Sequence, residues 1–296
     1  MFDRDFMEYH QDRFEDCSLM IYKDEKLIAV LPANAVDKKV YSHQGLTYGG
    51  LVVSDKLKLK DVAECLKVVL NYYKEHGFET LQLKQLPAIY SPIPNDEMQY
   101  LSFILKADLI KRDTLAVLNL KHKPKLSKDR IAGNKRALKQ NLVVKEVEAF
   151  DAFWNTILIP NLNAKHEAQP VHSLQEIISL KSKFPKNIRQ FNVYQDNVLV
   201  AGTTIFETKQ VAHSQYISGN ADKNIIGSLD FLHLHLIHEV FKDKSYFDFG
   251  ISNENQSKNI NQGLQYWKEG FGARTITQDF YEIDLNNINK LDAVFI

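Results

Sequence analysis

The stretch that decides the fold is SYFDFGISNENQSKNINQGLQYWKEGFGARTITQDFYEIDL, from Ser245 to Leu285. Its opening residues alternate like a buried strand, and Gly250 then frees the backbone for a polar loop from Ser252 to Asn261. From Gly263 the apolar residues recur at helical spacing, and Arg274 to Leu285 alternates like a closing strand. A strand, a polar loop, a short helix and a strand in this order are typical of the edge of an active site.

A family resemblance rests on the same stretch. Asn259, followed by Tyr266, Gly270 and Phe271, resembles the helix-to-strand signature of the GNAT acyltransferases. The phrases DFGISNEN and GLQYWKEGFGAR resemble the FemAB-like, tandem-GNAT branch of that superfamily. The resemblance implies an α/β fold with a mixed α+β sheet, built from two tandem GNAT-like acyl-CoA N-acyltransferase units.

The order of predicted elements fits such a duplication. Each half of the chain reads as a strand meander followed by helix, strand, helix and strand, without obvious sequence identity between the halves. We expect an N-terminal unit over residues 1–120, a basic linker helix over 121–141 and a C-terminal unit with the active site over 142–296. Compared with the family, the first unit lacks its opening strand and helix, so we expect an N-terminal truncation.

Composition limits the class of protein. The chain has 296 residues, 44% hydrophobic and 25% charged, which are globular values. Its 37 basic and 37 acidic residues balance, so no global field favours nucleic acid or a membrane. Only Cys17 and Cys65 are present, which excludes a disulfide framework, and no apolar run approaches the length of a membrane span. We expect a cytoplasmic protein without a membrane span.

Three residues are candidate catalysts. The resemblance implies that Tyr266 protonates the departing thiolate, although a Tyr beside a Trp also commonly anchors a helix. Glu254 is an accessible base in the polar loop, and His213, at the end of the meander, is a further base. Strict alternation places His213 and Tyr216 on opposite faces of their strand, and only a bulge would bring them to one face.

The loop DKNIIGSL, from Asp222 to Leu229, opens the helix after the meander. In GNAT enzymes this loop holds the coenzyme A pyrophosphate, which implies cofactor contacts at Asn224, Ile226, Gly227 and Ser228. Gly227 and Ser228 match the end of the family motif. Asp222 instead replaces a basic or amide residue, and Ile225 replaces a glycine. The expected cofactor is thus acyl-coenzyme A as a co-substrate, with no tightly bound group.

Substrate contacts are expected from polar residues near the same strands and from a glycine-rich stretch of the first unit. These are His43, Tyr48, Tyr216, Asp248 and Asn253. His43 and Tyr48 have a structural alternative as part of a bulge and a turn, and Asp248 has one as a buried structural carboxylate. The sequence has no zinc-type spacing, Walker loop or GxSxG motif, so we assign no metal ligands.

Three functions remain open from the sequence. The first is transfer of an acyl group, such as acetyl, from acyl-coenzyme A to a primary amine of a small metabolite, amino sugar or cell-envelope precursor. The second is a Fem-like transferase that uses aminoacyl-tRNA and acts on a peptidoglycan precursor; the basic segment from Lys121 to Lys139 would contact the tRNA. The third is a binding module without catalysis. The oligomeric state is not encoded in any recognisable pattern.

Overall fold

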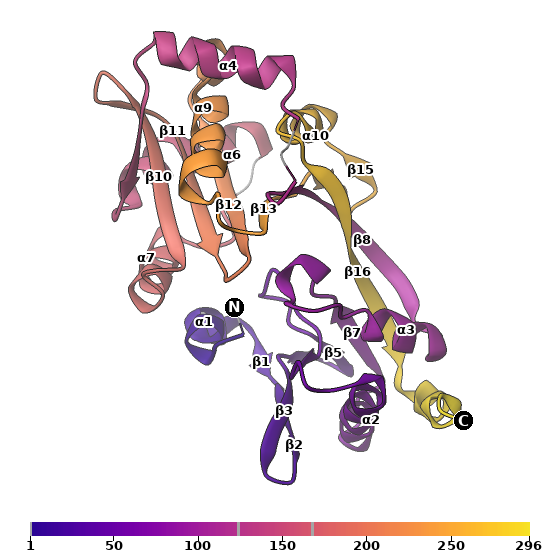
Figure 1. The fold of residues 1–296 in the computed structure, drawn as a ribbon. Helices are drawn as coiled ribbons and strands as arrows, with labels where there is room; N and C mark the ends of the chain where they lie inside the picture. The colour runs from indigo at the N-terminus through magenta and orange to yellow at the C-terminus, as the bar shows by residue number, and fades with distance from the viewer. Residues whose placement is uncertain (1, 123–124, 167–168) are drawn as a thin grey trace. The chain divides into compact units, whose positions relative to one another are not determined.

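The fold is described from a computed structural model, which covers residues 2–122, 125–166 and 169–296 (Figure 1). It is a mixed α/β protein, as predicted, and divides into two compact units. Unit 1 comprises Met1–Asp113 and Thr277–Ile296, and unit 2 comprises Thr114–Ile276. Within the described ranges, no helix is both long enough and apolar enough to cross a lipid bilayer.

These bounds differ from the predicted division in three places. Residues 114–120, expected in the first unit, belong to unit 2, and so does the basic helix, expected as a separate linker. The last twenty residues, expected in the second unit, belong to unit 1. The physical reason for the last difference is strand pairing, because residues Phe280 to Asp284 form an antiparallel ladder with Lys84 to Thr80. Lys123 and Pro124 of the basic segment lie outside the described residues.

Unit 1 packs a long helix against a small sheet. The strand order is β1-β4-β5-β7-β16, with β2, β3 and β6 in a separate three-stranded sheet. Its elements are α1 (Arg4–Met7), η1 (Glu8–Arg13), β1 (Glu15–Asp16), β2 (Leu19–Lys23), β3 (Lys26–Leu31), β4 (Asn34–Val36), β5 (Lys39–Tyr41), β6 (Val52–Val53), α2 (Leu59–Glu75), β7 (Thr80–Lys84), η2 (Ala88–Tyr90), α3 (Glu97–Ile104), the start of β8 (Asp108–Asn119), most of β16 (Arg274–Asp284) and η5 (Leu285–Ala293).

Helix α2 is the central element of this unit. Its apolar residues recur at helical spacing and are buried together with Leu81, Leu83 and Ile283 of the sheet. It ends before Gly77, whose φ of +86° is readily adopted only by glycine. The helical spacing of its apolar residues and the glycine after its end together account for the bounds of α2.

Unit 2 is a six-stranded sheet with helices on both faces. Its strand order is β8-β13-β12-β11-β10-β9. Its elements are the rest of β8, α4 (Lys128–Lys139), β9 (Val143–Val147), α5 (Asp151–Phe153), η3 (Trp154–Leu158), α6 (Ile159–His166), α7 (Leu174–Lys183), β10 (Ile188–Gln195), β11 (Val198–Glu207), β12 (Val211–Gly219), α8 (Lys223–Ile226), α9 (Ser228–His235), η4 (Leu236–Val240), β13 (Tyr246–Ile251), β14 (Asn253–Glu254), β15 (Asn259–Ile260), α10 (Gln262–Glu269) and the start of β16.

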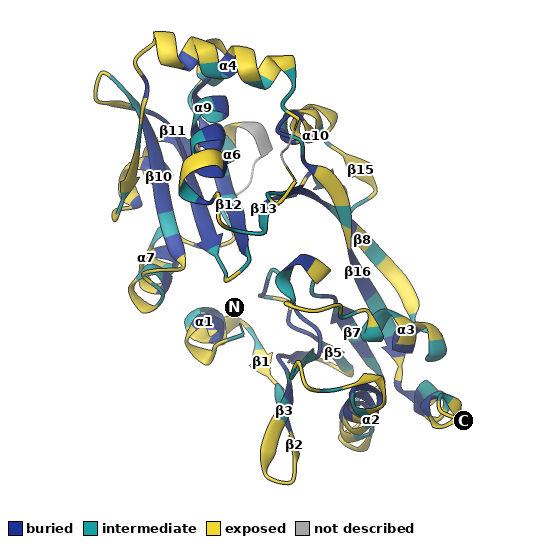
Figure 2. Cartoon of the chain, in the orientation of Figure 1, coloured by how far each residue is buried: buried dark blue, intermediate teal, exposed yellow. Residues whose placement is uncertain are grey.

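The two faces of this sheet differ in character. Figure 2 shows that β10, β11 and β12 are largely buried. One face carries an apolar core that includes Ile205 with residues of α9 and η4. On the other face, Trp154 of η3 donates a hydrogen bond to Thr204 across 3.4 Å. Alternation along β11 thus separates an apolar face from a buried polar one.

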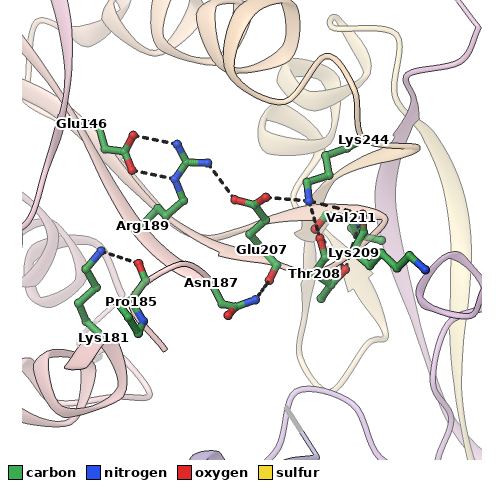
Figure 3. A network of polar contacts seen from close by, with 10 residues as sticks. All are labelled: Glu146, Lys181, Pro185, Asn187, Arg189, Glu207, Thr208, Lys209, Val211 and Lys244. Carbon is green, nitrogen blue, oxygen red and sulfur yellow. Dashed lines mark hydrogen bonds and ion pairs between the residues drawn. The ribbon is translucent and has the colours of Figure 1, made fainter. Parts of the chain in front are cut away.

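A charge network stabilises one end of the unit 2 sheet (Figure 3). Arg189 of β10 donates two hydrogen bonds to Glu146 of β9, at 2.7 and 2.8 Å, and a third to Glu207 of β11 at 2.8 Å. Lys244, just before β13, reaches Glu207 at 2.7 Å and the Thr208 carbonyl at 2.7 Å. Paired, two-point contacts of this kind are the stronger form of ion pair. They link three neighbouring strands to the entry of a fourth.

We expect the substitution Arg189→Gln to lower the free energy of unfolding of unit 2 by about 1–3 kcal/mol, because two carboxylates lose a charged donor. Both tryptophans of the chain, Trp154 and Trp267, lie in unit 2, so urea unfolding followed by tryptophan fluorescence reports on this unit. The exposed Lys186→Gln is the matched control, with an expected change near zero. Equal stabilities of the two variants would show that the network adds nothing.

Candidate functional site

The candidate site lies where two parallel strands of unit 2 separate. β12 and β13 pair through only three residue pairs, from Val211 with Tyr246 to His213 with Asp248. Both strands continue beyond that point, β12 to Gly219 and β13 to Ile251. The two strands therefore give each other no ladder partners past the last pair.

Two bulges accompany this divergence. The pairing of β11 with β12 shifts between Thr204, opposite Tyr216, and Ile205, opposite Ser214, so that Gln215 is an extra residue. The pairing of β13 with β8 also shifts, between Asp248 and Ile251. The first bulge changes the side-chain alternation, so His213 and Tyr216 face the same side of the sheet. Strict alternation, as expected from the sequence, does not hold here.

His213 and Asp248 form a buried pair at the last point of strand pairing. His213 Nδ1 lies 2.9 Å from Asp248 Oδ2, and the other carboxylate oxygen accepts a hydrogen bond from the Gly250 N–H at 2.7 Å. His213 Nε2 lies 3.1 Å from the Gln215 side-chain oxygen. Both ring nitrogens of His213 thus lie within hydrogen-bonding distance of a side-chain oxygen. This is the arrangement of a histidine oriented by a carboxylate.

Lys268 of α10 lies next to this pair and was not predicted. It is 2% exposed, and its Nζ donates to the carbonyl oxygens of Gly250 at 3.1 Å and Ile251 at 2.6 Å. Burial lowers its pKa to about 8, against an opposing effect of the Asp248 charge. The sequence signal was available, since Lys268 follows Trp267 and precedes Phe271 by three residues, on the side of the helix that faces the core.

The predicted acid and base have separate partners. Tyr266 is 59% exposed, and its hydroxyl donates to Asp129 of α4 at 2.7 Å, which raises the tyrosine pKa. Glu254 is exposed in the β14–β15 hairpin and accepts a hydrogen bond from the Asn261 side chain at 2.9 Å. In the described part of the chain these two side chains do not contact each other. The geometry therefore gives no support to a mechanism that uses both on one acyl group.

The remaining substrate candidates are all held by other side chains or backbone. The Asn253 side-chain oxygen accepts from the Thr114 N–H at 2.8 Å. Tyr216 is buried, and its hydroxyl lies 2.6 Å from His172 Nδ1. In unit 1, the Tyr48 hydroxyl lies 2.7 Å from that of Tyr90, while His43 stacks on His10. Burial lowers the pKa of His43 to about 4, so this imidazole is neutral at pH 7.

Helix α4 packs against the loop that the sequence predicted as a phosphate-binding loop. Gly227 has a φ of +73°, and a Cβ there would lie 2.1 Å from the Gly133 carbonyl oxygen of α4. A Cβ on Gly133 would in turn lie 1.7 Å from a carboxylate oxygen of Asp230, in the first turn of α9. Helix α4 therefore packs directly on the loop that contains Asn224, Ile226, Gly227 and Ser228.

Asp230 supplies the negative charge at this helix start. It is buried, lies 2.5 Å from Arg130 and accepts a hydrogen bond from the Trp267 indole at 2.9 Å. Burial raises its pKa, and the cation of Arg130 opposes that shift. A carboxylate at a helix N-terminus satisfies the same dipole that would attract a diphosphate. The geometry thus favours an internal anion over a bound one.

We expect the buried Lys268 to produce a specific pH dependence of stability. An unfolded lysine has a pKa of about 10.4, and the folded one has a pKa of about 8. Between these values the unfolded chain binds one more proton, so this group increases stability as the pH rises. The Lys268→Met variant lacks this pH-dependent gain. Between about pH 8 and 10.4, its free energy of unfolding minus that of the native chain should therefore fall by about 1.4 kcal/mol per pH unit. Urea unfolding by tryptophan fluorescence measures the difference.

The exposed Lys258→Met is the control for this experiment, with a stability difference that stays constant with pH. A flat difference for Lys268→Met as well would show that the ammonium is not desolvated.

Comparisons with known proteins rest on structure alone. No family model matches the chain, and no curated protein matches its sequence. Among solved structures, FemX is 10% identical, with a TM-score of 0.68, covering 97% of this chain and 92% of that one. The C-terminal domain of a putative lysylphosphatidylglycerol synthetase from Agrobacterium fabrum is 12% identical, with a TM-score of 0.61 and coverages of 94% and 91%.

A tandem GNAT protein from the clavulanic acid biosynthesis pathway is 13% identical, with a TM-score of 0.50 and coverages of 96% and 88%. These identities are too low to transfer activity, but the shared architecture spans nearly the whole chain. The predicted fold is confirmed: the chain has a tandem GNAT-like fold, and FemX is among the solved structures that share it.

Proposed function

We propose that the protein transfers an aminoacyl group from aminoacyl-tRNA to the primary amine of a cell-wall precursor or related acceptor. The observation that carries the choice of donor is the closed start of α9. There the Asp230 carboxylate and the Gly133 backbone pack against the loop at which the family resemblance expects a coenzyme A diphosphate. A donor carried by tRNA does not depend on that position.

The outward side of α4 supports the same donor. Arg130 and Arg136 are used within unit 2, on Asp230 and on the carbonyl oxygens of Asn224 and Ile225. The lysines of the same helix are exposed and are Lys128, Lys135 and Lys139. Exposed lysines along one helix bind a phosphate backbone, with an affinity that falls as salt rises. The structural likeness to FemX and to a lysylphosphatidylglycerol synthetase domain is consistent with aminoacyl chemistry.

The chemistry at the strand divergence follows from the groups present. The acceptor amine attacks the ester carbonyl carbon, a C–N bond forms, and the C–O bond to the tRNA ribose breaks. His213 Nε2, after release from Gln215, takes the amine proton while Asp248 stabilises the imidazolium. Backbone N–H groups of β12 beyond its last pair with β13 stabilise the oxyanion, and the ribose oxygen leaves with the proton that the His213 imidazolium returns.

Lys268 supports this chemistry by fixing the turn of β13 after Asp248, through its bonds to two carbonyl oxygens. Glu254, exposed at the hairpin, is available to orient the acceptor amine.

Acyl transfer from acyl-coenzyme A is the second candidate. It is favoured by the left-handed Gly227 at a helix start, which retains the end of the family motif. In this case α4 would have to move from the loop for the diphosphate to bind at Asn224 to Ser228. The third candidate is a module that binds one of these ligands without catalysing transfer.

One experiment separates the donors. The protein is incubated with radiolabelled aminoacyl-tRNA or with acetyl-coenzyme A, and with peptidoglycan precursors, amino sugars and amino acids as acceptors. We expect tRNA discharge that depends on the acceptor. Acceptor-dependent thiol release would instead establish the second candidate, and binding of either donor without product would contradict catalysis.

The substitution His213→Gln should reduce the rate of transfer about 10²- to 10⁴-fold, because a positioned proton acceptor is removed. His238→Gln, an exposed histidine of the same unit, is the matched control and should retain the native rate. Tryptophan fluorescence checks that both variants are folded. Equal rates would remove His213 from the mechanism.

Charge removal on α4 tests the tRNA contact. The triple substitution of Lys128, Lys135 and Lys139 to Gln should weaken tRNA binding. It should also make the negative slope of log K against log salt less steep, by about 2–3. The control is the triple substitution of the exposed Lys56, Lys60 and Lys74 of unit 1 to Gln, which changes the net charge equally. If both triple variants weaken tRNA binding equally, the lysines of α4 do not form a specific tRNA contact.

A further inference from the structure

The first half of β8 is a free strand edge in unit 1. Residues 108–113 of this strand have β16 on one side. On the other side β13 pairs only with residues 115–119, so in the described part of the chain no strand pairs with the outer side of residues 108–113. Figure 2 shows this half of β8 as largely exposed. A row of outward N–H and C=O groups is a template for another strand.

Two hydrogen bonds show which backbone groups of β8 face outward. The Thr114 N–H donates to the Asn253 side chain at 2.8 Å, and the Leu120 N–H donates to the Ser245 carbonyl oxygen at 2.9 Å. Asn253 and Ser245 flank the two ends of β13, so even-numbered residues direct their backbone groups away from β16. Three residues of the free half share this orientation: Asp108, Ile110 and Arg112.

This edge has few of the features that protect free strands from pairing. Residues 108–113 read DLIKRD, without a proline. Leu109 and Ile110 are each 46% exposed. Lys111, whose charge could block the edge, instead donates to Asp113 at 2.9 Å, and its Nζ lies 4.5 Å from the centre of the Phe280 ring. Its ammonium therefore lies over the face of the sheet.

The charges of the segment select one register for a second copy. Since the outward backbone groups belong to even-numbered residues, an antiparallel pair must have its twofold axis through a residue. With the axis at Ile110, Asp108 lies opposite Arg112 of the second copy, once on each side of the axis. An axis at Asp108, Lys111 or Arg112 would instead place a charge opposite itself, which is destabilising. An axis at Leu109 would pair no opposite charges.

Both members of this charge pair are accessible. Asp108 is exposed, and its carboxylate makes no hydrogen bond or ion pair with the described residues. Arg112 donates from Nε and Nη2 to Asp279 at 2.5 and 2.7 Å, and its Nη1 has no acceptor within the described ranges. Asp279 thus holds the guanidinium in place, with one nitrogen left for a second carboxylate.

From these observations we infer that the protein forms a twofold-symmetric dimer through β8. Residues 108–112 of two copies pair antiparallel about Ile110, and each outward residue exchanges backbone hydrogen bonds with the residue opposite. Ion pairs between Asp108 and Arg112 of the second copy flank the contact between the two Ile110 side chains. The edge lies in unit 1, so the dimer does not depend on the transfer chemistry proposed for unit 2.

Sedimentation velocity on the full chain tests the inference. The paired segment is short, so we expect a weak dimer that dissociates on dilution from about 500 to about 5 µM. Asp108→Lys should raise the dimer dissociation constant at least about tenfold, because it places like charges opposite each other on both sides of the axis. Asp55→Lys, at an exposed aspartate of unit 1, is the matched control with the same change in net charge and should retain the native constant.

Cysteine substitution tests the register. Opposite residues of a hydrogen-bonded antiparallel pair have Cα atoms about 5.5 Å apart, which a disulfide can span. Ile110→Cys should therefore form an intermolecular disulfide under mild oxidation, seen on a non-reducing gel. Leu109→Cys is the matched control and should not, because in this register Leu109 lies opposite Lys111. The native chain, which keeps Cys17 and Cys65, gives the background.

Any one of three results would overturn the inference. The first is a native chain that sediments as a monomer at about 500 µM. The second is an equal dissociation constant for Asp108→Lys and Asp55→Lys, with thermal unfolding showing that both variants are folded. The third is equal cross-linking of Ile110→Cys and Leu109→Cys, which would exclude the proposed register.

Discussion

The buried carboxylate of Asp230 is the constraint on which the architecture of unit 2 depends. It brings together Arg130 of α4 and Trp267 of α10 at the first turn of α9. Removal of one partner of a buried ion pair leaves an uncompensated charge, which costs far more than an exposed pair contributes. Three helices from distant parts of the sequence are thereby fixed to one another, and α10 is the helix that presents Lys268 to the strand divergence.

The same contact satisfies the N-terminal end of helix α9. A helix start is a general anion site because its N–H groups and dipole point outward. Here a side-chain carboxylate satisfies that site, and the glycine pair Gly133 and Gly227 lets a second helix approach to backbone contact. The GNAT-like fold is present, and the start of α9 is satisfied by groups of the chain itself. Because a fold does not determine a function, the fold alone does not identify the donor.

Local pattern was sufficient for most elements of the fold. Helix α2 and the β10–β11–β12 meander follow from the spacing of apolar residues, and the structure contains both. The paired strand that returns the end of the chain to unit 1 was not predictable in the same way, because strand neighbours far apart in sequence leave no local signal.

The candidate site was only partly predictable for a related reason. His213 and Asp248 were both identified, but their pairing depends on the parallel register of two strands and on bulges that no short pattern encodes. Lys268 was missed because a lysine in an amphipathic helix is ordinarily solvated. Tyr266 came from a motif, and its contact with Asp129 depends on the packing of α4, which sequence periodicity does not report.

The assignment of both chain ends to unit 1 has a consequence for synthesis. Domains generally fold as units while the chain leaves the ribosome from its N-terminus. Unit 2 is one continuous segment and is complete once Ile276 has emerged, whereas unit 1 still lacks the partner strand of β7. The unit whose first residues are translated first is consequently the last to complete its fold. Its sheet lacks one strand until residues 277–296 have been synthesised.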